Sequence, residues 1–170
     1  MKLISRSVFI LVAVLCGILV KAQEISFPDS FALNRTEFSD SHIPISREIL
    51  RDHGFTNISN PGIATDENII DHLAGDLAAE EISRIYFGIY AQKMSPTKED
   101  FSVVVIEFKS TEDLEKSLEI IDEIGLFMPV YLTKDHHLIA IRGENSSVIG
   151  KIANSYINNV GAKLYLPGQR

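Results

Sequence analysis

Apolar residues in the second half of the chain follow two spacings, one typical of strands and one typical of helices. Residues 101–108 include four consecutive β-branched side chains, which predicts a strand that is buried on both faces. Shorter apolar runs predict further strands at residues 85–91, 130–132, 138–141 and 163–166. These segments make up most of the predicted sheet.

Two helices are predicted between these strands, because apolar residues recur there at intervals of three or four positions. Thr111 is expected to cap the first helix and Gly125 to end it. Ser146 or Ser147 is expected to cap the second, and Gly161 to end it.

The predicted order over about residues 101–166 is strand, helix, strand, strand, helix, strand, which is the ferredoxin-like βαββαβ arrangement. Two right-handed crossovers would put both helices on one face of the sheet. The strand at 85–91 must then lie at an edge, or the strand order differs from the standard one. Tyr86, Tyr90 and Tyr131 could line one side of this sheet, where core packing is favoured over a surface that binds a flat ligand. The predicted fold class is α+β, with an antiparallel or mixed sheet.

Two further helices are predicted in the N-terminal half. One begins at Pro44 and ends at Gly54, and the other is capped by Thr65 or Asp66 and runs to about Arg84. These two helices could cover the second face of the sheet. We expect residues 23–170 to form a single α+β domain that begins with an irregular arm at 23–42.

The start of the chain has the pattern of a secretory signal peptide. Lys2 and Arg6 precede an unusually apolar run at residues 8–20, which is short for a membrane span. We interpret residues 1–22 as the signal peptide, with the working protein beginning at Gln23 in the periplasm or outside the cell. An uncleaved membrane anchor is the competing interpretation.

Removal of this segment changes both the cysteine content and the charge. Cys16 is the only cysteine, so the exported chain would have neither a disulfide bond nor a thiolate ligand. Cleavage would remove three basic residues and no acidic residue, so the formal net charge would change from −7 to −10. Such an acidic chain is a poor partner for nucleic acid or for an anionic membrane surface.

Three asparagines fit the N-glycosylation pattern, namely Asn34, Asn57 and Asn145. In a eukaryotic secretory pathway they would mark exposed loops. The absence of cysteine pairs favours a bacterial periplasm or bacterial secretion instead. The sequence leaves both sources open.

One resemblance accompanies these patterns. The segment at residues 67–75, followed later by a β-branched strand and by Ser110-Thr111-Glu112-Asp113, resembles a family of exported bacterial domains of unknown function. The resemblance covers about half of the chain. It implies a periplasmic setting and no known activity.

Two groups of side chains could hold a metal ion. His136 and His137 lie in a predicted hairpin turn, with Asp135 as a third ligand, although neighbouring residues on a strand point to opposite faces. The competing interpretation is a solvated polar turn.

The second group consists of His72, Asp76 and Glu80, spaced four residues apart on the predicted second helix. One helical stripe of this kind could bind a divalent cation. It could equally be the polar border of the apolar face.

No catalytic or cofactor motif is present. The chain has no Gly-x-Ser-x-Gly nucleophile turn, no glycine-rich phosphate loop and no His-Glu-x-x-His zinc pattern. We therefore expect no catalytic residue and no cofactor, and an exported binding or interaction module rather than an enzyme.

The alternatives are a small metal-binding protein or metal-dependent hydrolase, and a protease-inhibitor or chaperone-like module. The partner would be an unknown protein or small ligand. An exposed sheet edge would allow homodimerisation.

Overall fold

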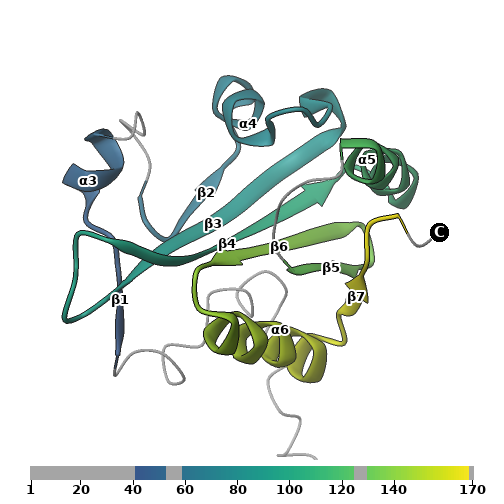
Figure 1. Cartoon of the computed structure of the whole chain (residues 1–170). Helices are drawn as coiled ribbons and strands as arrows, with labels where there is room; N and C mark the ends of the chain where they lie inside the picture. Colours follow the sequence, from purple (N-terminus) through teal and green to yellow (C-terminus); the bar gives the residue numbers. More distant parts are fainter. Residues whose placement is uncertain (1–40, 53–58, 125–129, 169–170) are drawn as a thin grey trace, which may run out of the picture.

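The computed structural model describes residues 41–52, 59–124 and 130–168 (Figure 1). They form an α+β fold in which helices lie on both faces of one antiparallel sheet. The strands are β1 (His42–Pro44), β2 (Gly62–Ala64), β3 (Ile82–Gln92), β4 (Glu99–Phe108), β5 (Val130–Lys134), β6 (His137–Gly143) and β7 (Lys163–Tyr165). The helices are α3 (Arg47–Asp52), α4 (Glu67–Ala74), the 3-10 turn η2 (Ala79–Glu81), α5 (Thr111–Ile124) and α6 (Ser146–Val160).

Several predictions concern residues outside the described ranges. The signal peptide, most of the 23–42 arm, Asn34 and Asn57 all lie there, as do two of the three glycines expected to end helices, Gly54 and Gly125. Among the helices of the described residues, none combines the length and the apolar character needed to cross a bilayer.

The strand order is β1-β3-β4-β6-β5-β7, with β2 also paired to β3. The predicted strands at 85–91 and 101–108 are confirmed, and they pair with each other as the long β3–β4 hairpin. The predicted strands at 130–132, 138–141 and 163–166 are confirmed as β5, β6 and β7. The sheet is therefore antiparallel throughout.

The ferredoxin-like prediction is wrong in the position of the last strand. That arrangement pairs the closing strand with the first one, β4, but here β3 occupies that place and β7 pairs with β5 at the other edge. A right-handed crossover that runs toward the opposite edge carries its helix to the opposite face. Accordingly α6 lies on one face of the sheet, and α4 and α5 lie on the other (Figure 1).

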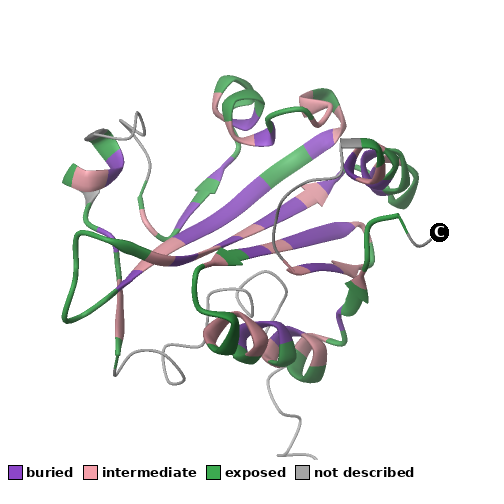
Figure 2. Cartoon of the chain, in the orientation of Figure 1, coloured by how far each residue is buried: buried purple, intermediate pink, exposed green. Residues whose placement is uncertain are grey.

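Alternation along β4 divides the core between these two faces. Val103 and Val105 pack toward α6, and Ile106 and Phe108 pack toward α4 and α5. All four side chains are buried, which confirms the predicted burial of this strand on both faces. In Figure 2 the centres of β3, β4 and β6 are buried and the outer sides of the helices are exposed.

The same alternation separates the three tyrosines. Tyr86 and Tyr90 belong to the α6 face, but Tyr131 packs with α5 on the other. The three side chains therefore do not share one side of the sheet, although Tyr86 and Tyr131 are buried in the core.

The second predicted helix is shorter than expected. Of the two caps predicted, Thr65 and Asp66, it is Asp66 that caps α4. Its side chain accepts hydrogen bonds from the backbone amides of Asn68 and Ile69. The helix ends at Ala74, because Gly75 adopts a positive φ of 63°. The chain then passes through η2 into β3, so Arg84 lies in a strand. Likewise, Pro44 belongs to β1, and the first helix begins only at Arg47.

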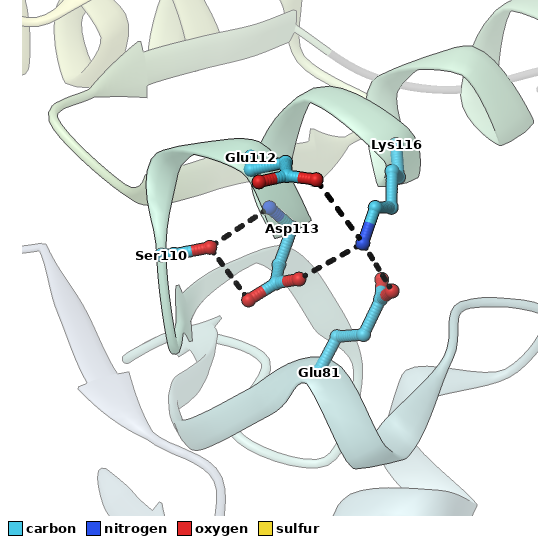
Figure 3. A network of polar contacts seen from close by, with 5 residues as sticks. All are labelled: Glu81, Ser110, Glu112, Asp113 and Lys116. Carbon is cyan, nitrogen blue, oxygen red and sulfur yellow. Dashed lines mark hydrogen bonds and ion pairs between the residues drawn. The ribbon is translucent and has the colours of Figure 1, made fainter.

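Two helix caps lie one residue earlier than predicted. Asn145, and not Ser146 or Ser147, caps α6 through its side-chain oxygen. Ser110, and not Thr111, caps α5: its Oγ accepts from the backbone amide of Asp113 at 3.1 Å and donates to the Asp113 carboxylate at 2.7 Å (Figure 3). Gly161 ends α6 with a φ of 70°, as predicted.

The start of α5 is also tied to η2. Lys116 lies 3.4 Å from Glu81 and 3.3 Å from Asp113, and it forms a longer pair with Glu112 (Figure 3). These exposed pairs add little stability individually, but together they hold η2 against α5 at the end of β4. That end of the sheet carries the site described next.

Candidate metal centre

The β5–β6 turn meets the last residues of β4 at one end of the sheet. Glu107 pairs with His137 in the β4–β6 register, and the amide of Phe108 donates to the carbonyl oxygen of His136 at 3.0 Å. Two segments that are far apart in the sequence therefore place three potential metal ligands together.

The turn itself explains why the two histidines share a side. Lys134 pairs with His137, so the connection has two residues, Asp135 and His136, and Asp135 adopts a left-handed φ of 53°. His136 is thus part of the turn and does not follow strand alternation. The two imidazole rings lie with centroids 4.4 Å apart. The prediction that these neighbouring residues point to opposite faces is therefore wrong for this pair.

The donor atoms of the three side chains nearly converge. His136 Nε2 lies 4.0 Å from Glu107 Oε1, and His137 Nε2 lies 3.7 Å from Glu107 Oε2. One ligand atom of each residue lies within 4.8 Å of the others. Donor atoms around a tetrahedral ion at about 2.1 Å lie roughly 3.4 Å apart, so a modest contraction would close the set.

Neighbouring groups orient the buried ligand. His137 Nδ1 lies 3.2 Å from the carbonyl oxygen of Lys134 and donates to it, which directs Nε2 toward Glu107. A hydrogen bond from the second ring nitrogen is the usual support for a metal-binding histidine.

Two side chains of β3 hold the carboxylate. Glu107 Oε2 lies 3.0 Å from Arg84 Nε and accepts a hydrogen bond from Tyr86 at 3.2 Å. These contacts fix Oε2 and leave Oε1 on the side of His136. Only 17 % of the Glu107 side chain is exposed, whereas Arg84 is 45 % exposed, so the contact with buried Tyr86 is the less screened of the two.

Burial also changes the pKa values of His137 and Tyr86. Desolvation, with a contribution from nearby His136, lowers the pKa of His137 from its ordinary 6.5 to about 4, although Glu107 opposes the shift. Burial, followed by the adjacent Glu107 carboxylate, raises the pKa of Tyr86. At neutral pH His137 is therefore an uncharged imidazole, which is the form that binds metals.

The other predicted ligands lie elsewhere. Asp135 forms an ion pair with Lys134 at 3.0 Å and is not part of the group. His72 is exposed on α4, but the helix ends at Ala74, so Asp76 and Glu80 do not continue its stripe. Within the described ranges, Glu107, His136 and His137 are the one group of three such residues that are close enough to hold an ion.

Glu107 was not predicted as a ligand. Its only sequence signal is a carboxylate between two apolar residues near the end of a buried strand, Ile106 and Phe108. The β4–β6 register is what places this carboxylate beside the two histidines.

No family model, curated protein or solved structure matches the chain. The geometry of this site is therefore the basis of the function proposed below.

Proposed function

We propose that the protein is an exported metal-binding module that holds one divalent transition-metal ion on Glu107, His136 and His137. The observation that carries the proposal is the convergence of two imidazole nitrogens and one carboxylate oxygen within 4.8 Å. The turn, the β4–β6 register and the contacts from β3 all support that convergence. Export remains the inference made from residues 1–22.

The donor types favour zinc or a neighbouring metal. Imidazole suits zinc, copper, nickel and iron, whereas calcium and magnesium prefer oxygen ligands alone. Three protein ligands leave one tetrahedral position for water or for a group from a partner. This open position is compatible with a binding role and also with hydrolysis, which an activity assay on the zinc-loaded protein would reveal.

The test is zinc titration of the purified protein by calorimetry, with native mass spectrometry to read the stoichiometry and the oligomeric state. We expect one zinc ion per chain. His136→Ala removes a half-exposed ligand, and Glu107→Gln replaces an anionic ligand with an isosteric neutral one. Each should weaken zinc binding by at least about tenfold.

His72→Ala is the matched control, because it removes an exposed histidine that lies outside the group. It should leave the zinc affinity unchanged. Circular dichroism would verify that each variant folds. Absence of zinc binding in the wild type, or equal binding in wild type, His136→Ala and Glu107→Gln, would refute the proposal.

A further inference from the structure

A cleft of about 340 Å³ lies at the opposite end of the sheet from the metal centre, on the face that carries α4 and α5. It is formed between α3 and the β3–β4 hairpin. Its volume falls in the range of about 300–1,000 Å³ that is common for small-molecule sites. Its apolar wall is made by Ile45, Ile49, Leu50 and Ile89.

The cleft wall is held in place by backbone hydrogen bonds. The amide of Ile45 donates to the carbonyl oxygen of Ile89 at 3.0 Å. The Asn60 side chain donates to both of these residues' carbonyl oxygens and accepts from the amide of Ile89 at 2.9 Å. These contacts hold the segment that leads into α3 against β3, so the cleft is formed before any ligand binds.

The sheet places polar groups beside this wall. Ile89, Ser102 and Arg142 occupy one cross-strand row on three neighbouring strands. The pair Tyr90↔Phe101 is followed by Ala91↔Glu99, so β4 has one extra residue at this point. Such a bulge reverses the alternation. It returns Glu99 to the face of Ser102, and Glu99 and Arg142 both line the cleft.

These two charges have no partner among the residues that the structure describes. Neither the Glu99 carboxylate nor the Arg142 guanidinium forms an ion pair or a side-chain hydrogen bond there. Their chain neighbours behave differently, because Lys98 and Glu144 pair with each other at 3.1 Å. The cleft is therefore lined by one exposed charge of each sign that no described residue pairs with.

We propose that this cleft binds a free α-amino acid with an apolar side chain. Its carboxylate would face Arg142, its ammonium group would face Glu99, and its side chain would lie on the isoleucine and leucine wall. A ligand with only a carboxylate would place a second negative charge beside Glu99. A ligand with only an amine would place a second positive charge beside Arg142. A zwitterion complements both groups.

The test is calorimetric titration of the purified protein with L-leucine, L-isoleucine and L-phenylalanine. We expect at least one of them to bind, and 4-methylpentanoate, which lacks the ammonium group of leucine, to bind more weakly. Arg142→Gln should weaken amino-acid binding by about tenfold or more, because it removes a charge-assisted contact. Glu99→Gln should weaken the binding of the amino acid but strengthen the binding of 4-methylpentanoate.

Lys98→Gln and Glu144→Gln are matched controls, since each removes the same charge from a neighbouring position outside the cleft. Both should leave binding within about twofold. The proposal is overturned if none of the three amino acids binds at about 10 mM, or if 4-methylpentanoate binds as tightly as leucine. Equal losses in the control variants would also overturn it, because they would reflect net charge alone.

Discussion

The carbonyl oxygen of Lys134 accepts a hydrogen bond from Nδ1 of His137 across the two-residue turn that separates them, at 3.2 Å. With Nδ1 on this carbonyl oxygen, Nε2 is the imidazole nitrogen that faces Glu107. This contact links the conformation of a hairpin turn to the chemistry of the candidate metal centre, because a turn of another length would direct the ring elsewhere.

The low pKa of His137 predicts a loss of stability in mild acid. The folded value of about 4 lies below the ordinary 6.5, so the unfolded chain binds the extra proton between these two values. With metal removed by chelator, the free energy of unfolding should fall as the pH drops from about 6.5 to 4, by of order 3 kcal/mol from this residue. Above pH 6.5, His137 should not change the dependence of the free energy of unfolding on pH.

Urea unfolding of wild type and His137→Gln across this pH range would measure the effect. Carboxylates add their own slope in both proteins, so the informative quantity is the difference between them. Parallel stability curves for the two proteins would contradict the assignment.

Tyr86→Phe should weaken zinc binding without unfolding the protein. The substitution keeps the buried ring but removes the hydroxyl that donates to Glu107 Oε2. Supporting contacts of this kind are typically worth 10- to 100-fold in metal affinity, and we expect a loss of about tenfold. Tyr90→Phe, on the same strand and face, is the control for calorimetric titration and should keep the wild-type affinity. A wild-type affinity for Tyr86→Phe would mean that Arg84 alone positions the carboxylate.

Asn60→Ala should destabilise the fold by about 2–3 kcal/mol. Its side chain makes three hydrogen bonds to the backbone of Ile45 and Ile89, and each typically contributes about 1 kcal/mol. Thermal or urea unfolding would measure this change. Asn159→Ala, which loses one exposed bond to Ser155, should change stability by less than about 0.5 kcal/mol. Similar effects of both substitutions would show that Asn60 does not anchor the segment.

Gly150 within α6 and Gly161 directly after it should respond in opposite directions to substitution by alanine. Gly150 lies within the helix with open space around its Cα, so Gly150→Ala should stabilise the protein by about 0.5–1 kcal/mol. Gly161 has a φ of 70°, so Gly161→Ala should destabilise it by about 1–2 kcal/mol. Differential scanning calorimetry would show the two shifts in melting temperature. A rise for both variants would mean that the end of α6 adjusts its backbone.

Local sequence patterns were sufficient for most elements of the fold. Strands β3 to β7 and helices α5 and α6 follow from apolar periodicity, and Gly161 from its freedom to adopt a positive φ. The errors at Ser110 and Asn145 are one residue long, since several neighbouring polar residues could each cap the helix. The overlong second helix has a similar origin: Gly75 was compatible with a helix interior until its φ was known.

The order of the strands and the candidate sites required long-range pairing. Nothing local to β7 distinguishes a place beside β4 from a place beside β5, yet this choice moves α6 to the other face of the sheet. His136 and His137 could be singled out from their spacing, but Glu107 joins them only through the β4–β6 register. Glu99 and Arg142 likewise share a cleft because a bulge in β4 reverses the alternation. Side-chain spacing along the chain reports neighbours within one element, whereas a site between elements depends on hydrogen-bond register, which many distant contacts set together.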